Sequence, residues 1–157
     1  MNRKIECSNS KTLKLSNALI TEINISDQSS FMNSVIKMDN YIKSKGATPI
    51  GPIIQKTMYK IDDNGELEIN VSLIRQANTF IENVEAPFCM ESVIRVSDCM
   101  YAHFVGPEKK LDVAFSKIKV IAFEEDIMLS SNNYIVFVDK KDDTIVADIF
   151  VEKKNNG

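Results

Sequence analysis

The sequence predicts an α+β domain in which two successive β-α-β-β units form an antiparallel sheet, with both helices packed on one face. Three observations predict this fold. Two segments, near residues 28–45 and 107–125, carry apolar residues at helical spacing. An extended run precedes each segment, and an extended hairpin follows it. Because the order of elements is the same in both halves of the chain, a repeat is favoured.

The first strand and helix are indicated by a change of periodicity. Residues 12–25 are rich in β-formers, and their alternation shifts near Asn17, as at a β-bulge. Ser26-Asp27 can then cap a helix over residues 28–45, and Gly46 is the residue type that follows a helix end. The apolar stripe of this helix consists of Phe31, Val35, Met38 and Ile42.

A hairpin follows this helix. Residues 53–61 and 66–73 flank a turn that ends in Asn64-Gly65, and Asn-Gly between extended runs is the strongest short-range hairpin signal. Apolar and polar residues alternate in the second run, which predicts one packed side and one wet side. Residues 74–88 fit either a short strand or a turn of helix.

The second half repeats this order. Residues 88–96 and 100–105 are expected as strands around a turn at Ser97-Asp98, and Gly106-Pro107 opens the helix over residues 107–125. A last hairpin joins residues 134–138 to residues 144–151. The apolar stripe of the second helix consists of Leu111, Phe115, Ile118 and Ala122. We expect all 157 residues to form one domain, with flexible ends at 1–10 and 153–157.

Charge and cysteine content bear on partners and location. A net charge of −3 and a pI near 5.3 argue against a nucleic-acid partner, and no apolar run is long enough to span a membrane. The three cysteines, Cys7, Cys89 and Cys99, lack the spacing of a metal site or a disulfide framework. We therefore expect a cytoplasmic protein with no metal and no cofactor.

Three segments carry a resemblance to a known family. Residues 51–60 begin with Gly-Pro and end with a tyrosine and a lysine. Residues 101–115 contain a predicted strand, then Gly-Pro, then the start of a predicted helix. Residues 147–151 form the predicted closing strand. Their order resembles the GyrI-like family, the effector-binding module of BmrR-type and some AraC-type regulators, which also occurs free-standing. The resemblance implies a groove between the two repeats that receives an apolar or cationic ligand.

The resemblance also implies what this chain lacks. Members of the family carry an acidic residue just before the penultimate strand, and in some members it acts in hydrolysis. The matching residues 130–134 contain no acid, so we expect no enzyme activity and assign no catalytic residue. The single histidine, His103, is interpreted as a packed or surface residue.

The candidate ligand-binding residues are large side chains from strands that the proposed fold brings together. They are Met58, Tyr59, Tyr101, Tyr134, Phe137 and Phe150. Because strand side chains alternate, only about half of them can face a groove, and ordinary core positions are the competing interpretation. Glu91 lies in an apolar run and could replace the missing acid. The function predicted is small-molecule binding, the alternative is contact with a partner protein through the same face, and the oligomeric state is left open.

Overall fold

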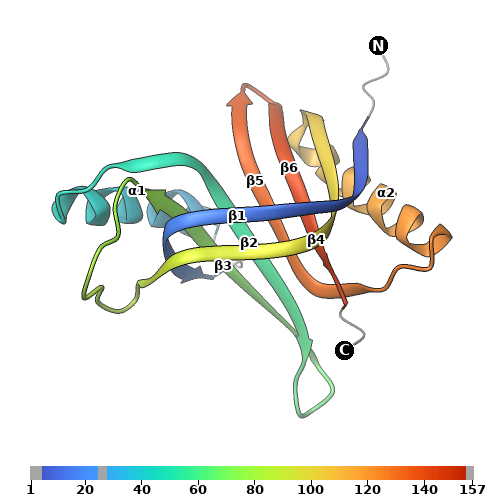
Figure 1. The fold of residues 1–157 in the computed structure, drawn as a ribbon, viewed down its shortest axis with the longest axis horizontal. Coiled ribbons are helices and arrows are strands. Elements are labelled where there is room, and N and C mark those ends of the chain that lie inside the picture. The colour runs from blue at the N-terminus through green and yellow to red at the C-terminus, as the bar shows by residue number, and fades with distance from the viewer. Residues whose placement is uncertain (1–4, 25–27, 155–157) are drawn as a thin grey trace. The chain divides into compact units, whose positions relative to one another are not determined.

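The structure, a computed structural model, describes residues 5–24 and 28–154 (Figure 1). The proposed cap at Ser26-Asp27 lies outside these residues. The fold is α+β, a mostly antiparallel sheet with two α-helices. The chain forms two compact units, one of residues 14–95 and one of residues 1–13 with 96–157. Strands β1 (Glu6–Ile23) and β4 (Cys89–Pro107) each contribute to both units.

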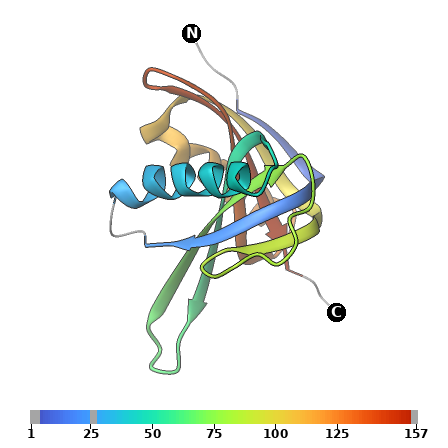
Figure 2. The same cartoon turned by 90° about the vertical axis from the view of Figure 1, so that its left-hand side faces the viewer.

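In the unit of residues 14–95, helix α1 (Gln28–Ser44) packs on a sheet of three strands. Strand β3 (Leu67–Ala77) lies between β1 and β2 (Pro49–Ile61) and is antiparallel to both. The helix contributes Met38 and Ile42 to a core with Leu19 and Leu73, and all four are fully buried. The β2–β3 hairpin projects away from the helix, below it in the view of Figure 2.

The other unit has the same order of elements. Strand β6 (Thr144–Lys153) lies between β4 and β5 (Leu129–Lys141), again antiparallel to both. A 3-10 turn, η1 (Glu108–Lys110), leads into helix α2 (Leu111–Glu124). Fully buried Ile118 of the helix packs against β4 and β6, in a core that also contains Met100, Ala102, Ile145 and Ile149.

Both helices end in the same backbone motif. The Ala47 N–H donates to the Ile42 carbonyl at 3.1 Å, and the Ile127 N–H donates to the Ala122 carbonyl at 2.8 Å. These bonds, six residues to one, define a Schellman end, in which the preceding residue has a positive φ. That residue is Gly46 in the first helix, as predicted, with φ +79°, and Asp126 in the second, with φ +56°.

The predicted helices and hairpins are confirmed, but three expectations about the strands are wrong. Residues 6–10 belong to β1 instead of a flexible tail, since tertiary contacts such as Ser10 Oγ to Asp98 at 3.0 Å hold them. No turn breaks β4 at Ser97-Asp98, because a positive φ of 57° at Asp98 is absorbed as an irregularity within one strand. Lys153 belongs to β6 instead of a flexible end, and the Lys154 N–H donates to the Met128 carbonyl at 2.8 Å. Residues 74–77, from the segment for which a short strand and a turn of helix both remained open, complete β3.

The residues of the two helical stripes are buried to different depths. Ile42 and Ile118 are completely buried. Phe31, Val35, Leu111 and Phe115 are half-buried and pack against the margins of the two cores. Each helix covers only its own three strands, so side chains near the helix borders keep one side in solvent. Neither α-helix of the described residues has the length and apolarity that a membrane crossing requires.

Candidate ligand-binding site

The sheet of the second unit presents its polar side chains on the face opposite α2. In β4, Ala102 and Phe104 belong to the core under the helix. Because successive strand residues point to opposite faces, Tyr101 and His103 point away from α2. The same alternation in β6 places Asp148 and Phe150 on that face. The β4–β6 register sets His103 opposite Asp148 and Tyr101 opposite Phe150.

Tyr101, His103 and Asp148, called here the Asp148 cluster, share one carboxylate oxygen. The Tyr101 hydroxyl donates to Asp148 Oδ1 at 2.6 Å, and His103 Nδ1 lies 2.7 Å from the same oxygen. The side chains of His103 and Asp148 are 36% and 25% exposed, so solvent reaches both. Burial and then the hydrogen bond to Asp148 raise the pKa of Tyr101, which keeps its hydroxyl a donor.

Aromatic rings support this cluster from one side. The ring of Tyr101 packs against that of Phe150 with centroids 5.1 Å apart and planes at 57°. Tyr134 of β5 lies opposite Phe150 in the register, and both are buried. Burial, followed by the charge of Glu152, raises the pKa of Tyr134 to about 12. The rings therefore form a fixed apolar backing, and the accessible part of the site is Tyr101 with its polar neighbours.

A cation already occupies one side of Tyr101. The ammonium of Lys11, from β1, lies 5.5 Å from the centre of the Tyr101 ring. This distance is within the range of a cation–π contact, in which the negative face of an aromatic ring attracts a positive charge. Lys11 is exposed, so its flexible side chain can leave the ring without unfolding the strand.

The other predicted site residues are divided between the units. Phe137 packs into the core under α2, on the opposite side of the sheet from Tyr101. In the unit of residues 14–95, Tyr59 is 41% exposed and Glu91 is exposed. Met58 lines a cavity of about 430 Å³ on the sheet face away from α1.

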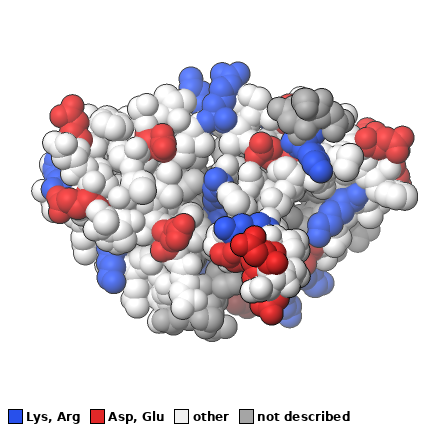
Figure 3. All heavy atoms as spheres, turned by 90° about the horizontal axis from the view of Figure 1, so that it is seen from below, with Lys and Arg blue, Asp and Glu red and all other residues white. Residues whose placement is uncertain are grey.

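This cavity is polar. Besides Met58 it is lined by two lysines, two glutamates and two small polar residues, namely Lys56, Lys60, Glu22, Glu68, Asn70 and Ser72. The Lys60 ammonium lies 3.6 Å from Glu68, so part of the charge is already paired. Acidic and basic side chains are also interspersed on the face that Figure 3 draws. A cavity with one apolar wall does not match an aromatic ligand, which needs mostly hydrophobic contacts.

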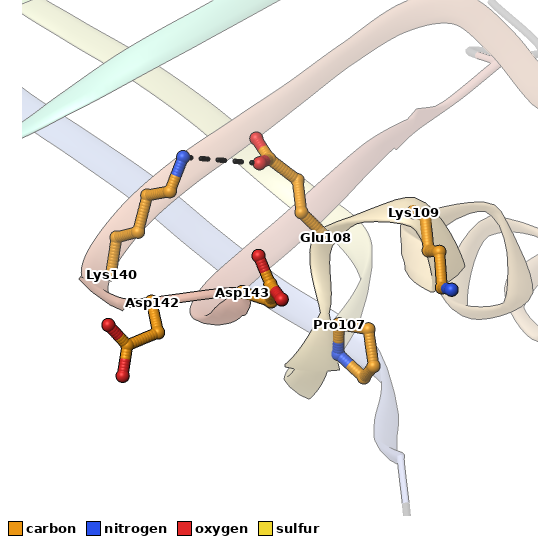
Figure 4. A pocket seen from close by; sticks show the side chains of 6 residues that line it. All are labelled: Pro107, Glu108, Lys109, Lys140, Asp142 and Asp143. Atoms are coloured by element: carbon orange, nitrogen blue, oxygen red, sulfur yellow. Dashed lines mark hydrogen bonds and ion pairs between the residues drawn. The ribbon is translucent and has the colours of Figure 1, made fainter.

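A second cavity, of about 440 Å³, lies beside the β5–β6 turn and the start of η1 (Figure 4). Lys140 and Glu108 form an ion pair across it at 3.3 Å, and Asp142 and Asp143 come from the turn. All four side chains are exposed. Within the described residues, no group of three or more His, Cys, Asp or Glu side chains could hold a metal ion. This cavity is therefore a solvated cleft between charged surface groups.

Asp148 is not among the site residues predicted from the sequence, and His103 is predicted there only as a packed or surface residue. The available signal is the alternation in residues 145–152, where Asp148 and Glu152 interrupt an apolar strand at spacing four. Spacing of this kind places both acids on one face of a strand. The partner of Asp148 in β4 is not visible from the sequence, because it lies 45 residues away.

No protein-family model matches this chain, and no curated protein matches it in sequence. Solved structures share its fold. EcmrR, in a cryo-EM structure of an EcmrR–DNA complex, aligns with a TM-score of 0.72 and 14% identity over 96% of this chain and 58% of that one. The present chain thus spans 58% of the length of EcmrR.

Two further structures align along nearly their whole lengths. The crystal structure of the EcmrR C-terminal domain gives a TM-score of 0.70 and 16% identity, covering 96% of this chain and 98% of that domain. A hydrolase from Listeria innocua gives 0.60 and 12%, covering 97% and 92%. These similarities establish the fold, and the function has to be argued from the site.

Proposed function

We propose that this chain binds small aromatic cations at the Asp148 cluster. The observation that carries the proposal is the position of Lys11, whose ammonium lies over the Tyr101 ring. The ring is thus already in contact with a positive charge, and the carboxylate of Asp148 is hydrogen-bonded to the hydroxyl of the same tyrosine. A ligand that carries both an aromatic surface and a positive charge can replace Lys11 and contact both groups.

The expected energies are modest for each contact. A cation over an aromatic ring contributes about 0.5–1 kcal/mol at an exposed site and about 2 kcal/mol when water is excluded. A large flat ligand gains more than an ammonium does, because it also buries apolar surface at roughly 25 cal/mol per Å². Phe150 packs against Tyr101, so the ring is held in place before the ligand arrives. Binding then causes little further loss of side-chain conformational entropy.

The resemblance to the GyrI-like family supports small-molecule binding in general, as does the fold shared with the EcmrR C-terminal domain. In this proposal Asp148 supplies the charge that the sequence suggested for Glu91. In this proposal Tyr101 contacts the ligand, Tyr134 belongs to the apolar backing, and Phe137 supports the sheet from its core side.

The proposal includes the duplication of a β-α-β-β unit. Two backbone features recur about 80 residues apart, the positive φ at Asn17 and Asp98 and the helix ends at Gly46 and Asp126. Both are conformations that L-residues rarely adopt. Their recurrence at equivalent places supports a repeat, although the two surfaces opposite the helices now differ in chemistry.

Calorimetric titration tests the proposal with a matched pair of ligands. Tetraphenylphosphonium is a permanent aromatic cation, and triphenylphosphine oxide is a neutral molecule of similar apolar surface. We expect the cation to bind more tightly than the oxide. We expect Lys11→Met to raise affinity for the cation about twofold to fivefold, because it removes the internal competitor. Asp148→Asn should lower the affinity for the cation and leave the affinity for the oxide unchanged.

Lys14→Met is the control, since Lys14 is an exposed lysine on the same strand. Lys14→Met changes the net charge of the protein by the same amount as Lys11→Met, but it does not remove the ammonium that lies over the Tyr101 ring. If Lys14→Met raises the affinity as much as Lys11→Met does, the effect is one of overall charge. Absence of binding by either compound to the wild type and to Lys11→Met would refute the proposal.

The β2–β3 hairpin supports a second candidate function, contact with a partner protein. Tyr59 pairs with Ile69 and Ile61 with Leu67 across the strands, and these four side chains are 38–65% exposed on one face. Apolar patches of this kind often mark protein contacts. Sedimentation velocity at increasing concentration tests self-association through the hairpin. Association that Ile61→Lys abolishes would support self-association through the hairpin, and a monomer at every concentration would exclude self-association.

A further inference from the structure

We propose that His103 determines which ligands the Asp148 cluster accepts, admitting cations while its imidazole is neutral and favouring neutral aromatic ligands once it is protonated. This inference rests on the proposed function and adds a charge selection to it. His103 is thus a specificity-determining residue whose state depends on pH.

The geometry couples the histidine directly to the carboxylate that meets the ligand. His103 Nδ1 lies 2.7 Å from Asp148 Oδ1, the oxygen that also accepts the Tyr101 hydroxyl at 2.6 Å. Among the described residues, Nδ1 is the only ring nitrogen of His103 with a hydrogen-bond partner. The side chain is 36% exposed, so water can deliver a proton to Nε2.

The two protonation states differ in the net charge of the cluster. A neutral imidazole donates its Nδ1 proton to Asp148, and the carboxylate keeps its full negative charge. A protonated imidazole places a positive charge at ion-pair distance from the same oxygen. The cluster then has no net charge, and a cation on the Tyr101 ring gains much less from Asp148. The aromatic surface is unchanged, so a neutral ligand is not penalised.

The surroundings of His103 contain few other groups that could produce the same effect. From β6 the facing charge is Asp148, and beyond it in the register β5 presents Val136, which does not titrate. On β4, Tyr101 keeps its proton because burial and the hydrogen bond to Asp148 raise its pKa. The charges near the Tyr101 ring are Lys11 and Glu6, both from β1. Histidine is the side chain whose ordinary charge change falls between about pH 5 and 8.

Titrations of the full chain at two pH values test the selection. At fixed ionic strength, we expect wild-type affinity for tetraphenylphosphonium to rise about fivefold to tenfold from about pH 5.5 to about pH 8. Triphenylphosphine oxide should bind equally at both. His103→Gln should bind the cation tightly at both pH values, because glutamine stays neutral and its amide can still donate to Asp148. The ligand charge is permanent, so only the protein titrates.

A spectroscopic measurement gives an independent readout. His103 is the only histidine, so its imidazole signals in an NMR pH titration need no assignment by mutation. Linkage is reciprocal: if the cation prefers the neutral imidazole, bound cation must move the histidine midpoint to lower pH. A tenfold preference corresponds to about one pH unit. The neutral oxide should leave the midpoint in place.

The outcomes separate this inference from the function on which it rests. Cation binding with the same affinity at both pH values, or an unmoved histidine midpoint with the cation bound, overturns the role of His103 and leaves the binding function intact. A pH dependence that persists in His103→Gln also overturns it. Failure of both compounds to bind the wild type and His103→Gln overturns the proposed function itself.

Discussion

The helix ends offer a stability test that depends on backbone conformation alone. Gly46 and Asp126 occupy the same position of the Schellman motif, with φ of +79° and +56°. A β-carbon placed on Gly46 would meet no atom within 4 Å. Gly46→Ala therefore introduces no clash, and its cost is that of holding an L-residue in the left-handed region.

The magnitude follows from two opposing contributions. The left-handed conformation costs an L-residue roughly 1–2 kcal/mol. Replacing glycine by alanine also removes about 0.4–1 kcal/mol of conformational freedom from the unfolded chain. We expect a net loss of about 1 kcal/mol for Gly46→Ala, or a fall of about 2–4 °C in Tm for a chain of this size.

Asp126→Gly should change stability in the opposite direction, by about 0.5–1 kcal/mol. Glycine removes the conformational cost at φ +56°. The substitution also removes a negative charge from the C-terminus of α2, where the helix dipole disfavours anions by about 0.3–1 kcal/mol. The last turn of this helix carries no basic residue to offset it. Asp126→Asn separates the two effects, since asparagine removes the charge but not the side chain.

Urea unfolding measures these changes as shifts in the urea concentration at the midpoint, while the slope of the unfolding free energy against urea stays constant. Gly46→Asn is the control for the first helix, because asparagine tolerates the left-handed region better than alanine. A Gly46→Ala protein with the wild-type midpoint would refute the conformational argument. A fall in slope would instead point to a change in the unfolded or native ensemble.

Three further predictions concern the cores and the buried groups. Ile118→Ala should cost about 2–5 kcal/mol in urea unfolding, as expected for a completely buried isoleucine. Phe115→Ala should cost less than the 3–5 kcal/mol typical of a core phenylalanine, because the ring is half-buried; a loss within that range would contradict the partial burial of Phe115. The pKa of Tyr134 is raised from 10.0 to about 12. Between these pH values the unfolded chain loses a proton that the folded chain keeps, so stability should fall as pH rises, and Tyr134→Phe should reduce this fall. Ellman's reagent should modify exposed Cys89 well before Cys99, whose pKa burial raises to about 11; simultaneous reaction of both thiols in the folded protein would contradict the structure.

The elements that the sequence predicts best are those that depend on neighbours along the chain. The helical stripes that contain Ile42 and Ile118 recur every three to four residues, and periodicity of that kind survives in any tertiary context. Gly46 ends its helix because few other residues accept a positive φ. The Asn64-Gly65 turn likewise fixes the β2–β3 hairpin from within a few residues.

Strand lengths are predicted less well, since distant residues decide them. The β1 and β4 strands continue through Asn17 and Asp98 although both residues have positive φ. Local sequence indicates a break at such points. Pairing with strands far along the chain holds the backbone extended on both sides of these residues. The hydrogen bond from Lys153 Nζ to Asp98 Oδ1, at 2.8 Å, further stabilises the extended backbone at Asp98.

The candidate site depends on the tertiary structure almost entirely. From the sequence, Glu91 is the carboxylate to consider, and His103 has no recognisable partner. The β4–β6 register decides otherwise by placing His103 opposite Asp148. A shift of one residue in that register would turn every side chain of a strand to the other face. Local sequence is enough to specify two amphipathic helices, alternating strands and a set of aromatic residues. Only the register of strands far apart along the chain decides which of those residues share a surface, because strand pairing is set by the packing of the whole core.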